Sequence, residues 1–270
     1  MVLNTSRTIY GVMLQNAVML GQPYVPLVNT TLNEKFDILS IYDITDKYPT
    51  VNLLTIGVGG SEYGLPQMNI KRSVHSPKDG ALFNHIPFFV REGNYTLTKT
   101  ENQRYRLVKQ VIHNDVVYTV AYGLVLNNFI YENKVYQLNS ITNNYNYTEY
   151  KTQYDSNILN PVNNGYVDLV NSDTGKYLIC TSSIIIDFTS KIIEEIMHAM
   201  DVFNNGSYVI NEMGLAASVE VELENGLLEN VSTQMTHFID VNYDVSNYKD
   251  NGININLDIG GSEPFVLTTS

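Results

Sequence analysis

The sequence has little of three things that many functions need: cysteine, basic charge and long apolar runs. Cys180 is the only cysteine, so the chain can form neither an internal disulfide bond nor a cluster of cysteine metal ligands. The 16 Lys and Arg residues are outnumbered by 28 Asp and Glu, which gives a net charge of -12. Because affinity for nucleic acid comes largely from basic side chains that neutralise phosphates, we expect no direct nucleic-acid binding.

Charge of either sign is scarce, at 16% of the residues, and tryptophan is absent. Tyrosine is abundant instead, with 20 copies beside 9 phenylalanines. Tyrosine offers a flat apolar face with a hydroxyl at its edge, and few charges leave neutral surface free for contact with other proteins. An AT-rich genome also favours Asn, Ile and Tyr codons, so the composition agrees with an assembly component without requiring one.

The most apolar N-terminal stretch, "TIYGVMLQNAVMLG", is interrupted by Gln15 and Asn16 and preceded only by Arg7. It is too short to span a bilayer and makes a poor signal peptide. We therefore expect it to be part of the folded protein, with no membrane association.

A glycine cluster follows an apolar segment in "NLLTIGVGGSEYG", residues 52–64. Gly57 and Gly59 fit the first two glycines of a dinucleotide-binding fingerprint, but Glu62 stands where the third belongs. No Lys-Ser/Thr pair follows, so the segment is no P-loop either. We expect no cofactor here, and interpret Gly57, Gly59 and Gly60 as a sharp turn after a strand.

A hairpin is predicted in "RYRLVKQVIHNDVVYTVAYGLVL", with a two-residue turn at Asn114 and Asp115. That turn pairs His113 with Val116, Val111 with Tyr118, Leu107 with Tyr122 and Tyr105 with Leu124. The register collects apolar side chains on one face, where we expect Leu107, Val111, Tyr118 and Tyr122 to be buried.

Further strands are predicted towards the C-terminus. Residues 235–245 and 253–259 alternate apolar with polar side chains, and "ASVEVEL" does the same before a turn at Asn225-Gly226. The alternate residues on the other face of that last strand are acidic, and we expect them to face solvent: Glu220, Glu222 and Glu224.

One principal helix is predicted in "TSKIIEEIMHAMDVFNNG", capped by Thr189 or Ser190 and ending near Gly206. A weaker helix is expected from about Asn33 to Asp43. The fold class is mainly β, an antiparallel sandwich or barrel-like fold with this one helix, or a β-rich α+β fold.

The segment 140–164 is rich in Asn and Tyr and has little apolar periodicity. We interpret it as a long loop or an arm that reaches a neighbouring molecule. It separates a β-rich part, 1–139, from a part with the helix and antiparallel strands, 165–270, unless the two form one continuous domain. The candidate interface residues in this segment are Tyr145, Tyr147, Tyr150 and Tyr154.

No catalytic constellation is evident. The five histidines accompany no HExxH motif or paired cysteines, so we expect no metal site and a structural role for each. "GGSEYG" and "GGSEPF" lack the second glycine of a nucleophile elbow, and the pair Glu194-Glu195 is interpreted as solvated charge on the helix. We expect no catalytic residue and no enzymatic activity.

Five segments occur in an order that resembles a family of virion structural proteins of large tailed bacteriophages. They are "TIGVGGSEYG", "SVHSPKDGALFNHIPFFVRE", "YRLVKQVIHNDVVYTVAYGLVL", "SYVINEMGLAASVEV" and "FIDVNYDVSNY...LDIGGSEPF". Their counterparts in the family are an "IGxGG" segment, an "LxxxIPFxxR" segment, a "YRLR"-like strand before a Tyr-rich strand, an "ISEIGL"-like segment and a late "EP" after paired glycines. The matching residues here are Ile56 to Gly60, Leu82 to Arg91, Tyr105 to Tyr122, Ile210 to Leu215 and Gly260 to Pro264. The resemblance is lost before about residue 30 and in the Asn/Tyr-rich segment.

The resemblance implies a non-enzymatic building block of the virion, made in the cytoplasm of the bacterial host. We expect a homo-oligomeric ring at the neck, as a head-tail connector, or along the tail, in contact with other virion proteins. A baseplate or capsid-surface component is the alternative within this class. A virion-associated glycan hydrolase is the alternative from another class, and it would require two carboxylates facing each other across a cleft.

Overall fold

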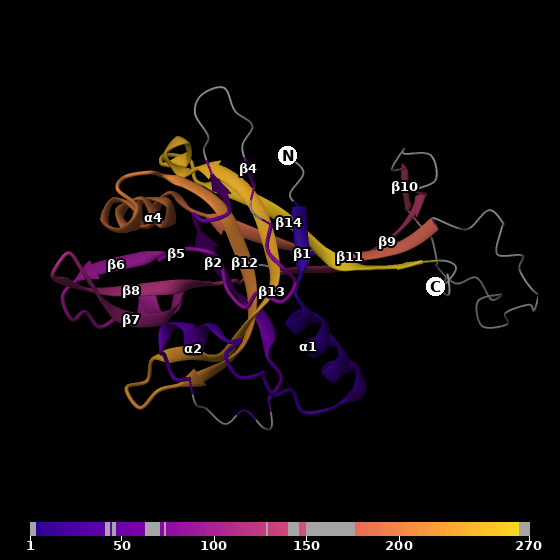
Figure 1. The fold of residues 1–270 in the computed structure, drawn as a ribbon, viewed down its shortest axis with the longest axis horizontal. Helices are drawn as coiled ribbons and strands as arrows, with labels where there is room; N and C mark the ends of the chain where they lie inside the picture. The colour runs from indigo at the N-terminus through magenta and orange to yellow at the C-terminus, as the bar shows by residue number, and fades with distance from the viewer. Residues whose placement is uncertain are drawn as a thin grey trace, which may run out of the picture. The chain divides into compact units, whose positions relative to one another are not determined.

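The computed structural model describes residues 4–40, 44, 47–62, 71–72, 74–127, 129–139, 146–149 and 176–264 (Figure 1). The chain forms two compact units. Unit 1 comprises Met1–Asn127 and Asp187–Asn254, and unit 2 comprises Asn128–Ile186 and Ile255–Ser270. The two parts expected on either side of segment 140–164 thus both contribute to unit 1.

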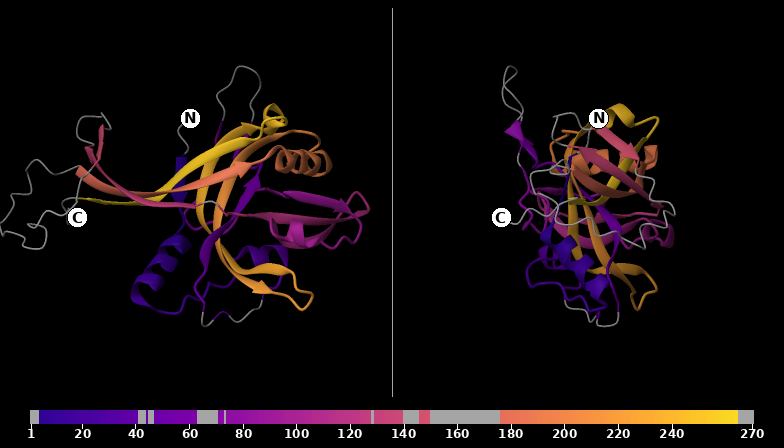
Figure 2. Two further views of the ribbon diagram at one scale, coloured as in Figure 1. Left: turned by 180° about the vertical axis from the view of Figure 1, so that it is seen from behind. Right: turned by 90° about the vertical axis from the view of Figure 1, so that its right-hand side faces the viewer.

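Unit 1 is built on an eight-stranded antiparallel sheet with the order β1-β13-β12-β2-β8-β6, to which β5 is added beside β2 and β7 beside β8. The strands are Asn4–Arg7 (β1), Thr50–Gly57 (β2), His85–Ile86 (β5), Phe89–Glu92 (β6), Tyr105–His113 (β7), Val116–Val125 (β8), Val209–Glu222 (β12) and Leu228–Asp244 (β13). A separate two-stranded ribbon pairs Ser61–Glu62 (β3) with Lys71–Arg72 (β4). Two further views show β12 and β13 curving together along their length (Figure 2).

The four α-helices that the structure describes each begin after a threonine. They are Ile9–Leu20 (α1), Leu32–Phe36 (α2), Lys99–Asn102 (α3) and Ser190–Phe203 (α4). In each, the threonine hydroxyl accepts a backbone N–H from the first turn, the contact that satisfies a helix end. Glu34 and Glu101 complete capping boxes in α2 and α3. A short 3-10 helix, Val245–Tyr248 (η2), follows β13.

One buried apolar cluster of unit 1 lies between α2 and the sheet. Leu32 and Phe36 of α2 pack on Leu53 of β2, with Leu107 and Met235 in the same buried cluster. Full burial of one such side chain contributes roughly 1.5–3 kcal/mol, so this cluster accounts for much of what holds α2 in place. The buried residues of α4 are Ile192, Ile193, Ile196, Ala199 and Met200.

The fold class is β-rich α+β, as predicted. In the part of the chain that the structure describes, the unit 1 sheet is open, with β1 and β6 at its ends, and closes into no barrel. The predicted principal helix is confirmed as α4, and the weaker one is shorter than expected, Leu32–Phe36. The apolar N-terminal stretch, for which no helix is predicted, forms α1.

The hairpin register is confirmed. β7 and β8 pair His113 with Val116, Val111 with Tyr118 and Tyr105 with Leu124. The fourth expected pair, Leu107 with Tyr122, is missing from the ladder, because the N–H of Leu107 donates to Glu229 instead. Asn114 and Asp115 form the turn with φ of 49° and 62°, the left-handed conformation that a type I′ turn requires.

The predicted burial of the hairpin face is wrong in part. Leu107 is buried, but Val111, Tyr118 and Tyr122 are only half-buried. Near the turn, Phe203 at the end of α4 is the ring that contacts Tyr118, at 5.9 Å between centroids. At the other end of the hairpin, Leu107 belongs to the buried cluster beside α2.

The expected solvation of charges is confirmed for Glu220, Glu222 and Glu224, which are exposed on β12 and just beyond it. It is wrong for Glu195. That carboxylate holds Arg91 of β6 through two hydrogen bonds of 2.6 and 2.7 Å, while Glu194 beside it is exposed. The bidentate pair ties α4 to the sheet.

Unit 2 contains a four-stranded sheet with the order β10-β9-β11-β14. Its strands are Phe129–Asn139 (β9), Asn146–Glu149 (β10), Lys176–Phe188 (β11) and Ile253–Pro264 (β14). The alternation predicted for β14 is confirmed, since Ile255 and Leu257 are buried and Asn256 is exposed. The expected loop or arm at 140–164 contains a strand, β10, and its other residues lie outside the described part.

Candidate functional site

The glycine-rich segment after β2 surrounds a carboxylate of the protein itself. Oε1 of Glu212, on β12, accepts hydrogen bonds from the backbone N–H of Gly59 at 2.8 Å and of Asn84 at 3.0 Å. Oε2 accepts one from the N–H of Phe83 at 3.0 Å and lies 2.9 Å from Nε2 of His75. Both oxygens are therefore doubly hydrogen-bonded, and we call this arrangement the Glu212 junction.

Close approach to Glu212 explains the glycines. A Cβ at Gly57 would lie 2.5 Å from the carbonyl oxygen of Asn84 and 2.6 Å from Oε1 of Glu212. A Cβ at Gly60 would lie 2.9 Å from the carbonyl oxygen of Asn211, and one at Gly59 would collide with Phe83. None of the three glycines has a φ in the left-handed range, so the need for glycine here comes from close packing and not from a turn conformation that other residues avoid.

His75 joins two carboxylates. Its ring is stacked between Phe83 and Phe238, with centroids 4.0 and 3.9 Å away and nearly parallel planes. Nδ1 lies 3.3 Å from Oδ2 of Asp79, while Nε2 contacts Glu212. The side chain is 7% exposed. The two phenyl rings fix the imidazole plane, so both ring nitrogens point at carboxylate oxygens.

Opposing effects act on the charge of Glu212. Burial favours the neutral acid, but the hydrogen bonds from His75 and from the N–H groups of Asn84, Gly59 and Phe83 outweigh it and lower the pKa. The carboxylate is thus held ionised with its lone pairs occupied. Such a group is suited to holding segments together and poorly suited to taking a proton from a substrate.

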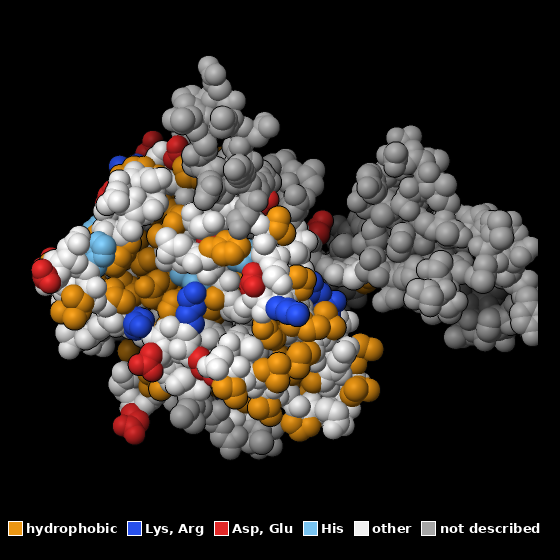
Figure 3. Space-filling view, viewed as in Figure 1, with side chains coloured by type: hydrophobic (Ala, Val, Ile, Leu, Met, Phe, Trp, Pro, Cys, Tyr) orange, Lys and Arg blue, Asp and Glu red, His pale blue; other side chains and the backbone are white. Residues whose placement is uncertain are grey.

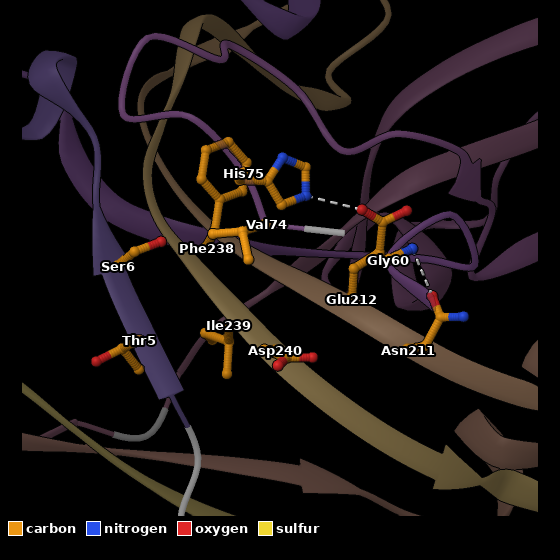
Figure 4. A pocket seen from close by; sticks show the side chains of 10 residues that line it. All are labelled: Thr5, Ser6, Gly60, Val74, His75, Asn211, Glu212, Phe238, Ile239 and Asp240. Carbon is orange, nitrogen blue, oxygen red and sulfur yellow. Dashed lines mark hydrogen bonds and ion pairs between the residues drawn. The ribbon is translucent and has the colours of Figure 1, made fainter. Parts of the chain in front are cut away.

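A cavity of about 160 Å³ adjoins the junction (Figure 4). Thr5 and Ser6 of β1 border it on one side and the His75–Glu212 pair on another. The complete lining is Thr5, Ser6, Gly60, Val74, His75, Asn211, Glu212, Phe238, Ile239 and Asp240. Pockets for drug-sized ligands measure about 300–1,000 Å³, so this smaller space suits a few waters or one small polar group.

A second buried carboxylate is held in the same manner. Glu229 of β13 accepts hydrogen bonds from the N–H of Leu107 at 2.8 Å, Val108 at 3.2 Å and Asn230 at 2.8 Å. Leu107 has a φ of 57°, which turns its N–H out of the hairpin ladder towards this carboxylate. Burial is the main influence and raises the pKa of Glu229.

The side chain of Arg106 is buried beside Glu229. Its guanidinium donates to the carbonyl oxygens of Asn102 and Tyr105, and to the carboxylate of Glu220 at 2.6 Å. Glu220, one of the three exposed acidic residues at the end of β12, is thus also the ion-pair partner of Arg106. Nε of Arg106 has no hydrogen-bond partner.

Of the four candidate interface tyrosines, the structure describes only the position of Tyr147. Tyr147 lies in β10 opposite Leu138 of β9. Tyr145, Tyr150 and Tyr154 lie outside the described residues. Their role at an interface stays a prediction.

Sequence reasoning did not single out Glu212, and it expected a structural role for His75 without identifying its partners. One signal for Glu212 was present: it is the only charged residue in "VINEMGLAASV" of β12, where its neighbours are buried. A lone carboxylate inside a buried strand requires hydrogen-bond donors from elsewhere in the chain. The sequence does not say which donors.

A model of a family of unknown function, DUF7208, matches residues 2–270. The chain belongs to this family. No curated protein and no solved structure matches it. The family description assigns no activity, so function has to be argued from the molecule itself.

Two further observations bear on function. Among the described residues, no group of three or more His, Cys, Asp or Glu side chains could hold a metal ion. No helix in the same residues is long and apolar enough to cross a membrane.

Proposed function

We propose that this DUF7208 member is a structural subunit of a tailed-phage virion, a ring-forming component of the neck or the tail. The observation that carries the proposal is the ordered set of five segments that resembles virion structural proteins. In this proposal the protein binds copies of itself and other virion proteins. It needs no cofactor and binds neither a membrane nor, directly, nucleic acid.

The position of these segments in the fold supports the proposal. Gly59, Phe83 and Glu212 belong to three different segments of the resemblance, yet they are joined by direct hydrogen bonds. A fourth segment contains the β7–β8 hairpin, whose Leu107 donates to Glu229. The resembling residues are thus those that connect distant parts of unit 1, as expected if a shared scaffold underlies the likeness.

The character of the buried carboxylates also supports a structural role. In the part of the chain that the structure describes, Glu212 and Glu229 are the two buried acidic residues, and both accept backbone N–H groups. A glycan hydrolase needs two carboxylates facing a substrate cleft. These two give that alternative no support.

The exposed acidic row suggests how such a subunit could surround DNA. Glu220, Glu222 and Glu224 are exposed at one end of the β12–β13 hairpin. In a ring around a DNA passage, an acidic lining would repel the duplex and let it slide without sticking. The competing explanation is that the acidity serves only solubility and has no preferred direction.

Quantitative mass spectrometry of purified particles tests the proposed function. Particles are purified on a density gradient and washed with high salt to remove adsorbed protein. We expect the chain to remain with the particles at several copies each, in a constant ratio to the major capsid protein. A chain that stays in the lysate, as a non-virion phage enzyme would, overturns the proposal.

A further inference from the structure

Helix α1 and the segment after it expose apolar side chains. On α1, Val18, Met19 and Leu20 are 54%, 74% and 72% exposed. In the following segment the corresponding values for Val25, Leu27 and Val28 are 67%, 51% and 80%. Figure 3 shows hydrophobic side chains gathered over this region of unit 1. We call these six residues the α1 face.

The opposite side of α1 is already buried. Tyr10 and Leu14 are buried, and Gly11 approaches Thr236 of β13 so closely that a Cβ there would lie 2.9 Å from its carbonyl oxygen. α1 is therefore apolar on its inner side and again at its exposed C-terminal end, while Gln15 and Asn16 are exposed in its middle. In α4, by contrast, Lys191, Glu194 and Asp201 are exposed opposite the buried stripe. Exposed apolar side chains gathered at one end of a helix, unlike scattered ones, mark a surface that another molecule covers.

The α1 face is held in place by its own backbone. Gly21 ends the helix in the left-handed conformation, with φ of 60°, and its N–H donates to Val18 while that of Gln22 donates to Ala17. This is the Schellman arrangement that fixes a helix end. Tyr24 then reaches back, with its hydroxyl donating to the side chain of Gln234. Met19 and Leu20 are thus presented on an ordered surface.

The charge pattern limits what can cover this face. From Thr8 to Asn33 the chain has no charged residue, although its net charge is -12. Arg7 lies against the first half of α1, where its guanidinium donates to Gln15 and to the carbonyl oxygen of Gly11. The six residues of the face itself carry no positive charge, so it lacks the run of basic residues with which interfacial helices bind anionic lipid. A neutral apolar surface is, however, complementary to itself. Two copies could meet here without bringing their acidic residues together.

The exposed area agrees with such a pairing. At roughly 100 Å² for each exposed side chain, the α1 face offers on the order of 600 Å² per copy, so two copies would bury on the order of 1,200 Å², the lower end of the range for specific interfaces. A single exposed residue would need no partner, but a continuous patch of this extent marks an interaction site.

We propose that the α1 face binds the α1 face of a second copy of this chain, in a two-fold symmetric contact. This deepens the proposed function and rests on it for its setting, in which the contact joins two copies within the particle. A two-fold contact closes after two copies, so the ring itself needs a separate head-to-tail contact elsewhere on the chain. Because the same surface is used by both partners, each substitution in the face acts twice in the pair.

Sedimentation velocity over a range of concentrations tests the pairing, with Met19→Glu and Val28→Glu as two independent variants. Both residues are well exposed, so neither substitution removes a core contact. Ile112→Glu is the matched control, because Ile112 is 76% exposed on β7, in the hairpin at the far end of unit 1 from α1 (Figure 1). Equal melting temperatures establish that all three variants are folded.

We expect wild type and Ile112→Glu to dimerise alike, and each variant of the α1 face to raise the dimer Kd by at least about 100-fold, since a carboxylate is then desolvated on both sides. Unchanged dimers in both face variants, an equal loss in Ile112→Glu, or a monomeric wild type would each overturn the pairing. Binding of monomeric wild type to phosphatidylcholine vesicles, lost in Met19→Glu, would assign the face to lipid instead. None of these results decides whether the chain is in the virion, which the particle analysis measures separately.

Discussion

Replacing Glu212 with alanine should be among the most destabilising single changes in unit 1. The substitution removes the acceptor for the N–H groups of Gly59, Phe83 and Asn84 and for Nε2 of His75. A buried donor left without a partner costs about 1–3 kcal/mol. Water entering from the adjoining cavity of about 160 Å³ would satisfy some of these donors. We therefore expect a loss of about 3–5 kcal/mol, the range for breaking a buried charged network.

Glu212→Gln separates charge from shape. The amide keeps one acceptor oxygen but turns an NH2 group towards donors, so we expect an intermediate loss of about 2 kcal/mol. The matched control is Glu222→Ala on the same strand, where the side chain is exposed and the change should stay within about 0.5 kcal/mol.

Urea unfolding followed by circular dichroism and by tyrosine fluorescence measures these differences. The chain has no tryptophan, so its 20 tyrosines supply the fluorescence. If Glu212→Ala unfolds within about 1 kcal/mol of wild type with an unchanged m-value, the junction is not what holds these segments together.

Three further predictions use the same measurement. Lowering the pH from 7 to 5 should destabilise the protein, because burial lowers the pKa of His85 to about 3 and of His237 to about 4, so below the ordinary value of 6.5 mainly the unfolded chain binds protons. The free energy of unfolding should fall by about 2 kcal/mol for each histidine at pH 5. His85→Gln should remove the contribution of His85, so its unfolding free energy should fall less between pH 7 and pH 5 than that of wild type. An equal fall in the two proteins would refute this. Gly57→Ala should cost about 3 kcal/mol or more through its clash at the junction, whereas Gly261→Ala, with open space around its Cβ, should cost less than about 1 kcal/mol; equal costs would contradict the packing argument. Leu107→Ala should lower the free energy of unfolding by about 3 kcal/mol, because Leu107 is fully buried. Val111→Asp should lower it by only about 1 kcal/mol, because Val111 is half-buried. A larger loss for Val111→Asp would contradict the burial described for this hairpin.

Local patterns in the sequence were enough to predict parts of this fold. The turn at Asn114 and Asp115 and the apolar alternation around it fix the β7–β8 register, because a slip of one residue would turn every side chain to the other face. The apolar stripe of α4 likewise follows from its 3.6-residue period. α1 was missed because its apolar residues form no single stripe: Gln15 and Asn16 interrupt the stretch, and Val18 to Leu20 are consecutive.

The Glu212 junction could not be predicted because its parts are far apart in the chain. Glu212 follows Gly59 by 153 residues and Phe83 by 129. The glycines resemble a phosphate cradle, and only the folded chain places a carboxylate of the protein there. The conformation of Leu107 was hidden for the same reason, since its N–H turns towards Glu229 on a distant strand.

A density map of the intact particle tests the central claim, that this chain is a ring-forming structural subunit, most directly. We expect repeated copies of the unit 1 fold around the axis of the neck or tail. If they surround the DNA passage, the row of Glu220, Glu222 and Glu224 should face the lumen. An inward surface lined by Lys and Arg would contradict the acidic conduit. Isolated copies away from any ring, or no density for this fold in the particle, would contradict the central claim itself.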